Sequence, residues 1–409
     1  MVKKSLLRAF LSLLLLSMFF VTACSATIVY ASSSWNVQTV DENGYLYDDR
    51  CPIALDSNDK PHILYSGFNH PYSYSILKYA GLNDSVWDSQ EIGSFATAFD
   101  LVLDAHNNPH VLYGSGGLKY ASWTGSNWVN QTVDSNGGFG SVALDASNIP
   151  HIAYKDGQAV KYASWTGIAW NIQTVENVSE SATLSLSIDQ NNTVYIMYQS
   201  DGARLAVYRN SSWNIQTVAT DLSTLGNIVL DFEGYPHFIY AVNYDFNNST
   251  LKYSHWNGAS WITQDVVSNT AIGYGWTPLP GSLALDSNNS PHIAYITSVP
   301  ELMYASWTGT TWDIQNIGNA YYNITQFEAT TSAESPCFLA LDSNDHPHIS
   351  YRIIPVHGYS DAHSIIMYTT TTDTNPTVTF ALWIAVPLVS IVVLAAIIYR
   401  WKKKTSAEK

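Results

Sequence analysis

The chain has 409 residues, 46% of them hydrophobic, and a formal net charge of −15 at pH 7. It is long enough to bury a sizeable core. Its acidic balance argues against a nucleic-acid partner, because a negative surface repels phosphate backbones. Residues 32–377 hold 32 of the 33 acidic side chains and only 10 of the 18 basic ones, so the imbalance is greatest between the two ends.

The N-terminus has the order of a secretory signal. Lys3, Lys4 and Arg8 precede a long apolar run, and small residues follow up to Ala31. This order predicts a signal peptide over 1–31. The stretch VTAC, which ends at Cys24, resembles a bacterial lipobox and offers the alternative of a lipidated cysteine.

The C-terminus carries an apolar span followed by basic residues. As a helix, residues 378–399 would be about 33 Å long, enough to cross a hydrocarbon core. The positive-inside rule places the basic tail 400–409 in the cytoplasm. We therefore predict a single-pass type I protein of the cell membrane, with an extracellular domain over 32–370, a linker over 371–377 and a transmembrane helix over 378–399. Removal of this helix by a sortase-like enzyme is an alternative.

Several sequons fit a glycoprotein with modified surface loops. Four of them begin at Asn83, Asn177, Asn210 and Asn323.

One motif, LDSNNSPHIAY at 285–295, recurs along the chain in variant form. Its aspartate is found at Asp56, Asp104, Asp145, Asp189, Asp231, Asp286 and Asp342. Six positions later the chain has His62, His110, His151, Tyr195, His237, His292 and His348. Nine positions later it has Tyr65, Tyr113, Tyr154, Tyr198, Tyr240, Tyr295 and Tyr351. The fixed register predicts seven repeated structural units.

Each unit has the pattern of four short strands. In the third unit these are SVALD, PHIAY, VKYASW and WNIQTV, separated by turn residues. Four antiparallel strands repeated seven times are typical of an all-β, seven-bladed β-propeller. The last unit, which ends in SIIMYTTTT, lacks a fourth strand, whereas the predicted mature N-terminus begins with one, SSWNVQTV. We expect this N-terminal strand to close the ring and to cover the open edge of the last blade.

Two cysteines occupy equivalent positions in the first and last units. Cys51 and Cys337 each precede their unit's aspartate by five residues. If the ring closes, these units are neighbours, and the thiols could form a disulfide in an oxidising exterior. Two buried free thiols are the alternative.

The repeated aspartate, histidine and tyrosine have two interpretations. Six imidazoles could bind a metal, and the aspartate turns faintly resemble calcium loops. We favour a structural role, because the trio occurs in every unit and Tyr195 replaces the histidine in the fourth. The aspartate would then bond its own turn, the histidine a backbone carbonyl, and the tyrosine would pack between blades. This interpretation predicts no metal and no cofactor.

Tryptophans flank the last turn of most units. They are Trp123, Trp128, Trp165, Trp170, Trp256, Trp261, Trp307 and Trp312. They could stack on sugars, but their regular pairing across a turn favours packing.

Long loops mark one sector. The longest connections between units lead into units one, six and seven, and the longest loops between second and third strands belong to units one, five and seven. Aromatic and polar side chains on such loops suit a recognition surface, although long loops are also tolerated without a role. The predicted binding residues are Tyr47, Arg50, His70, Tyr72, Tyr274, Trp276, Tyr321, Tyr322, His357, Tyr359, Asp361 and His363.

The units LALDSNNSPHIAY and LMYASWTGTTWDIQNI resemble the propeller repeats of secreted or anchored archaeal and bacterial surface proteins. These repeats are distantly similar to sialidase-like, Asp-box propellers. The resemblance covers residues 35–370 and implies the fold rather than an activity. The arginine clamp of a sialidase has no counterpart, since Arg50, Arg204, Arg209 and Arg352 occupy unrelated positions in their units.

We therefore expect a membrane-anchored, cell-surface binding or adhesion module for glycan or protein ligands. A structural envelope component without a selective ligand is one alternative. A carbohydrate-active enzyme, a sialidase-like glycosidase or a lyase, is another, although the sequence contains no recognisable catalytic constellation.

Overall fold

The computed structural model describes residues 34–45, 50–69, 74–178, 183–245, 248–270, 281–297, 301–319, 336–353 and 364–372. Within these ranges all regular structure is β-strand, and no helix is long and apolar enough to span a membrane. The predicted signal peptide, transmembrane helix and basic tail lie outside the described residues.

Each sequence repeat forms consecutive antiparallel strands. The strands of units one to three are β2 (Ile53–Leu55), β3 (Pro61–Asn69), β4 (Tyr74–Asn83), β5 (Val86–Ser94), β6 (Thr97–Leu103), β7 (Pro109–Gly114), β8 (Leu118–Trp123), β9 (Trp128–Asp134), β10 (Gly140–Leu144), β11 (Pro150–Asp156), β12 (Ala159–Trp165) and β13 (Trp170–Asn177). Those of units four and five are β14 (Leu184–Ile188), β15 (Val194–Ser200), β16 (Gly202–Arg209), β17 (Ser212–Ala219), β18 (Thr224–Leu230), β19 (Pro236–Asp245), β20 (Asn248–Trp256) and β21 (Trp261–Thr270). Those of units six and seven are β22 (Ser282–Leu285), β23 (Pro291–Ile296), β24 (Glu301–Trp307), β25 (Trp312–Asn319), β26 (Phe338–Leu341), β27 (Pro347–Ile353) and β28 (Ser364–Thr372).

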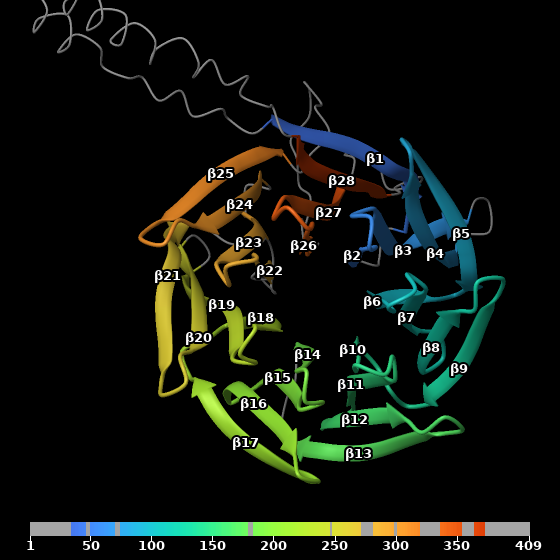
Figure 1. Cartoon of the computed structure of the whole chain (residues 1–409), viewed down its shortest axis with the longest axis horizontal. Coiled ribbons are helices and arrows are strands. Elements are labelled where there is room, and N and C mark those ends of the chain that lie inside the picture. Colours follow the sequence, from blue (N-terminus) through green and yellow to red (C-terminus); the bar gives the residue numbers. More distant parts are fainter. Residues whose placement is uncertain are drawn as a thin grey trace, which may run out of the picture. The chain divides into compact units, whose positions relative to one another are not determined.

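Units two to six each form a separate four-stranded sheet. Units one and seven belong to one eight-stranded sheet, and β1 (Ser34–Gly44) lies between β28 and β3 in its strand order. The sheets are arranged around a common centre, with the first strand of each unit innermost and the fourth outermost (Figure 1).

The repeat aspartate shapes the turn between the first and second strands. In unit six, Asp286 Oδ1 accepts the backbone N–H groups of Asn288 at 2.8 Å and Ser290 at 2.6 Å. Asn289 between them has φ of 61°, a left-handed conformation that asparagine tolerates better than most residues. Pro291 then opens the second strand, so local turn chemistry fixes how the two innermost strands meet.

The hydrophobic core is divided among the interfaces between neighbouring units. Each of seven buried clusters joins two units; one example packs Leu251 and Tyr253 of unit five against Leu283 and Ile293 of unit six. The cluster that joins units seven and one contains Ile366 and Tyr368 from β28 and Cys51, Ile63 and Tyr65 from unit one, with Val40 of β1 packed against it.

Strand β1 makes the contacts that fourth strands make elsewhere. Trp128 at the start of β9 packs edge-on against Tyr79 of the preceding unit, with ring centroids 5.6 Å apart. Trp35 at the start of β1 packs against Tyr304 of unit six in the same way, at 5.3 Å.

The end of β1 is also equivalent to the ends of fourth strands. Asp41 Oδ2 accepts Tyr65 Oη at 2.9 Å and Lys78 Nζ at 2.8 Å from unit one. Asp134 of β9 accepts the equivalent Tyr154 hydroxyl, at 2.8 Å, and the Lys161 ammonium, at 3.2 Å, from unit three.

Candidate binding site

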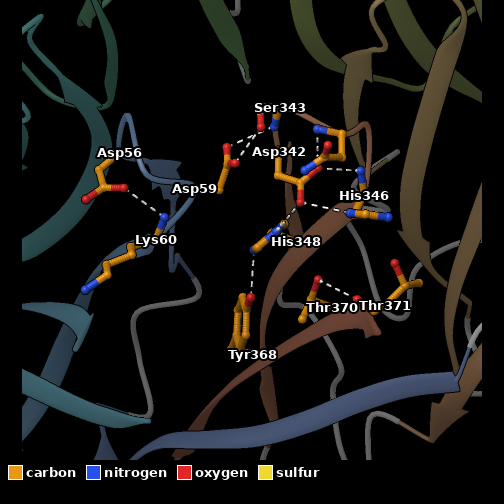
Figure 2. Close-up of polar contacts among 11 residues, drawn as sticks. Asp56, Asp59, Lys60, Asp342, Ser343, His346, His348, Tyr368, Thr370 and Thr371 are labelled. Atoms are coloured by element: carbon orange, nitrogen blue, oxygen red, sulfur yellow. Dashed lines mark hydrogen bonds and ion pairs between the residues drawn. The ribbon is translucent and has the colours of Figure 1, made fainter. Parts of the chain in front are cut away.

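The repeat histidines are buried or nearly buried, each within its own unit. In unit seven, His348 lies between Asp342 and Tyr368 (Figure 2), with Nδ1 2.6 Å from the tyrosine hydroxyl and Nε2 3.7 Å from the carboxylate. The same arrangement joins His62 to Tyr79, His110 to Tyr120, His151 to Tyr162, His237 to Tyr253 and His292 to Tyr304. The expected backbone carbonyl partner was therefore wrong: the partner is a third-strand tyrosine hydroxyl.

The charge state of these histidines follows from burial. Burial lowers the pKa of all six, although the neighbouring aspartate raises it, and the pKa of His237 falls to about 4. A neutral imidazole can donate from Nε2 toward the carboxylate and accept the tyrosine proton at Nδ1. Within the described ranges no three His, Cys, Asp or Glu side chains are grouped to hold a metal ion.

The tryptophan pairs cover the hairpins between third and fourth strands. The ring centroids of Trp123 and Trp128 are 5.5 Å apart, and the rings are tilted by 59°. Trp165 and Trp170 repeat this contact, as do Trp256 with Trp261 and Trp307 with Trp312. All eight rings are partly buried.

Both cysteines are buried free thiols in the structure. Burial raises the pKa of Cys337, and the neighbouring Cys51 raises it further. The two side chains are thus close enough to interact electrostatically, as their equivalent positions in units one and seven require.

Of the predicted binding residues, Arg50 alone lies within the described part of the chain. Tyr47, His70, Tyr72, Tyr274, Trp276, Tyr321, Tyr322, His357, Tyr359, Asp361 and His363 lie outside it. Arg50 is one of the residues that line a cavity.

A cavity of about 260 Å³ occupies the centre of the sheet arrangement. All seven units line it, with residues at or near the start of each innermost strand. The chain enters these strands from the connections between units, and the predicted residues Tyr47, Tyr274 and Tyr321 belong to such connections. The cavity therefore lies at the end of the innermost strands that these connections precede in the sequence.

Arg50 and Asp100 are the charged residues among the described lining of this cavity. The Arg50 guanidinium lies 3.8 Å from the centre of the Phe139 ring, a cation–π contact, and Phe99 packs edge-on against the same ring. Burial raises the pKa of Asp100, opposed by hydrogen bonds from Val142 N–H and Ser141 Oγ and by the charge of Arg50.

Asp100 also binds one unit to the next. It follows a register shift in β6, and its carboxylate accepts Val142 N–H at 2.9 Å and Ser141 Oγ at 2.8 Å from unit three. Asn227 within the bulge of β18 makes the equivalent bridge to Leu283 of unit six.

Sequence reasoning missed Asp100, although the signal was present. Asp100 stands four residues before its repeat aspartate, where the other units have Pro52, Ser141, Ser185, Asn227, Ser282 and Phe338. It is the one charged residue at that position. The cavity thus combines short polar side chains, phenyl rings and one charged pair, a lining that suits a small, hydroxyl-rich ligand.

Another lining residue has unused hydrogen-bonding capacity. Thr183 Oγ1 is buried and has no partner among the described residues. A buried hydroxyl of this kind is usually satisfied by water or a ligand.

No protein-family profile and no curated protein sequence matches this chain. Solved structures match it in fold. The streptogramin B lyase structure has a TM-score of 0.53 and 9% identity, covering 83% of this chain and 98% of that one. Virginiamycin B lyase from Staphylococcus aureus has a TM-score of 0.53 and 10% identity, with coverages of 82% and 99%. A PL25 ulvan lyase has a TM-score of 0.51 and 11% identity, with coverages of 80% and 94%. At these identities the likeness concerns the fold alone, and this chain is similar in fold to β-propeller proteins.

Proposed function

We propose that residues 35–371 form a seven-bladed propeller in which β1 is the fourth strand of the last blade. Support comes from the strand order β28–β1–β3 and from Trp35 and Asp41, which repeat contacts made by fourth strands inside the chain. Closure in this way covers the edge of β28, which would otherwise be open to pairing with another chain.

The propeller is displayed outside the cell. This part of the proposal rests on the sequence, in which a secretory signal precedes the domain and an apolar span with a basic tail follows it.

The propeller acts as a glycan-binding module, and the ligand enters the central cavity. The observation that carries the proposal is the cavity lining, in which Arg50 lies over Phe139 beside Asp100 and short hydroxyl side chains complete the wall. Its volume lies just below the range of about 300–1,000 Å³ typical of sites for drug-sized ligands, so a single sugar unit fits better than a peptide segment. Phenyl rings offer apolar stacking surfaces, and the polar side chains can exchange hydrogen bonds with sugar hydroxyls.

The charge of the domain narrows the ligand class. Residues 32–377 carry far more acidic than basic side chains, so a polyanionic glycan would be repelled on approach. We therefore favour a neutral glycan. The ulvan lyase is described as a polysaccharide lyase, so in that protein a similar fold acts on a polysaccharide.

A glycan array probed with soluble residues 32–372 tests the proposal. We expect binding to neutral glycans that weakens by about tenfold or more in Arg50→Ala, because the cation–π contact and the partner of Asp100 are lost together. Arg209→Ala is the matched control, since Arg209 is an exposed arginine at the end of β16.

The outcomes of this array separate the three candidate functions. Absence of any glycan hit would favour the envelope-component alternative, and unsaturated or hydrolysed products from a hit glycan would favour the enzyme. Equal binding by Arg50→Ala and wild type would show that the central cavity is not the glycan-binding site.

A further inference from the structure

A ring of side-chain bridges joins the turns at the other end of the innermost strands. The residue three positions after the repeat aspartate has positive φ in every unit. In five units its side chain accepts a backbone N–H from the preceding unit's turn, whereas Asn192 of unit four makes no such bond within the described residues. Asp59 accepts Ser343 N–H at 2.9 Å (Figure 2), and Asn289 accepts Phe232 N–H at 3.3 Å. The same bridge is made by Asn107, Asn148 and Asp345.

Units four and five are not bridged in this way, because the residue at the bridging position of unit five has no side chain. Unit five has Gly234 at this position, with φ of 80°, so nothing reaches the backbone N–H of Gln190 as the bridging side chains do elsewhere. A hollow of about 420 Å³ lies at this interface, lined by the turns of the two units, and Gly234 is part of its wall.

The turn of unit five departs from the repeat at two further positions. Phe232 stands where other units have Ser57, Ala105, Ala146, Gln190, Ser287 and Ser343, and its side chain is 66% exposed. Glu233 stands where other units have asparagine, serine or histidine. Both residues line the hollow. Three consecutive departures from the repeat thus coincide with a cavity and an exposed aromatic ring.

The aspartates of the hollow are largely occupied by their own turns. Asp189 Oδ1 accepts the N–H groups of Asn191 and Thr193 at 2.9 and 2.8 Å, and Tyr195 Oη lies 3.4 Å from Oδ2. Asp231 Oδ1 accepts Tyr235 N–H at 2.7 Å, and His237 Nε2 lies 3.4 Å from Oδ2. These carboxylates retain acceptor capacity for single hydroxyl donors, whereas a bound cation would compete with the bonds that hold both turns.

We propose that this hollow is a second carbohydrate subsite, which takes one neutral pyranose unit. The apolar face of the sugar stacks on Phe232, its hydroxyls donate to Glu233 and to the remaining acceptor positions of the aspartate carboxylates, and Gln190 N–H donates to a sugar oxygen. The subsite shares the ligand class of the proposed function. It lies at the opposite end of the innermost strands from the central cavity, so the failure of one site is distinguishable from the failure of the other.

Titration of soluble residues 32–372 carrying Arg50→Ala favours this subsite, because the substitution is expected to weaken binding in the central cavity by about tenfold or more. Saturation-transfer NMR with methyl glycosides of glucose, galactose, mannose, fucose and N-acetylglucosamine provides the readout. We expect at least one of these sugars to bind, and Phe232→Ser to weaken its binding by about tenfold. Gly234→Asn is expected to abolish binding, because the asparagine side chain would extend into the hollow and accept the Gln190 N–H that is proposed to bind the sugar.

These variants are expected to fold. A Cβ at Gly234 would lie 3.5 Å from the nearest atom, Asp189 Cβ, and asparagine occupies the same left-handed position in other units. The control is Ala146→Ser in unit three, which places the same serine in a turn without the hollow. The proposal is overturned if none of the five sugars binds, if Phe232→Ser and Gly234→Asn leave binding unchanged, or if cationic glucosamine binds where the neutral sugars do not.

Discussion

Protonation of His237 should destabilise the fold in mild acid. The ring is 4% exposed, with Nδ1 2.5 Å from Tyr253 Oη, Nε2 3.4 Å from Asp231 and the His255 ring stacked at 5.3 Å. Burial lowers its pKa, Asp231 raises it and His255 lowers it, and the net result is a fall from 6.5 to about 4.

The sign of the effect follows from the lowered pKa. The unfolded chain takes up a proton as the pH falls through 6.5, whereas the folded chain resists it until about pH 4. Stability is therefore fully retained above pH 6.5 and decreases below it. At about 1.4 kcal/mol per pH unit, this one group removes roughly 2 kcal/mol between pH 7.5 and pH 5, and roughly 3 kcal/mol once the pH is below 4.

The repeat supplies a matched variant. Unit four has Tyr195 at the position of His237, so His237→Tyr places a residue there that the fold already accepts and that does not titrate in this range. Urea unfolding of both proteins at pH 7.5 and pH 5 gives the two free energies of unfolding. We expect the wild type to lose roughly 2 kcal/mol more than the variant across this interval. Equal losses in the two proteins would refute the argument.

Three further predictions concern the seam and the backbone. Asp41→Ala at the seam and Asp134→Ala inside the chain should each lower the free energy of unfolding by about 1–3 kcal/mol, and a loss confined to Asp134→Ala would contradict their equivalence. Alkylation of the secreted protein without reductant tests the state of Cys51 and Cys337, which are buried free thiols in the structure rather than the predicted disulfide; we expect no reaction in the folded protein and reaction at both thiols after unfolding, and reaction only after reduction would contradict this. Gly281→Ala should lower the free energy of unfolding, measured with urea, by at least about 2 kcal/mol more than Gly309→Ala. Both glycines have φ above 90°, but only at Gly281 would an added Cβ clash with a backbone oxygen, Ala294 O. Similar losses in the two glycine variants would show that the contact is unimportant.

Most of the fold could be predicted from the repeat pattern. Turns such as 286–290 recur with the same spacing because the aspartate, the left-handed residue and the proline act locally, and local rules can be read from sequence. The last unit lacks a fourth strand, and an extra strand precedes the first unit. Together these two features predicted that β1 pairs with β28, although the two strands are far apart in sequence.

Side-chain partners across strands were harder to predict. The histidine was expected to bond a carbonyl, yet its partner is a third-strand tyrosine such as Tyr79. This tyrosine recurs in every unit, but its position in sequence does not show which side chain it faces. Asp100 and Gly234 were overlooked for a different reason. Each matters because it departs from the repeat, so the repeat pattern itself does not predict its role.

Relocation of the N-terminal strand tests the ring most directly. One variant starts at Tyr45 and lacks residues 35–44; a second carries the same residues after Thr371, joined by the turn Thr-Gly-Ser-Asn that links β8 to β9. The measurement is the melting temperature of both variants against soluble residues 32–372. If β1 is the fourth strand of the last blade, the relocated chain melts within roughly 3 °C of the parent, whereas the shortened chain melts at least about 10 °C lower or does not fold. A shortened chain as stable as the parent, or a relocated chain as unstable as the shortened one, would contradict the closed ring.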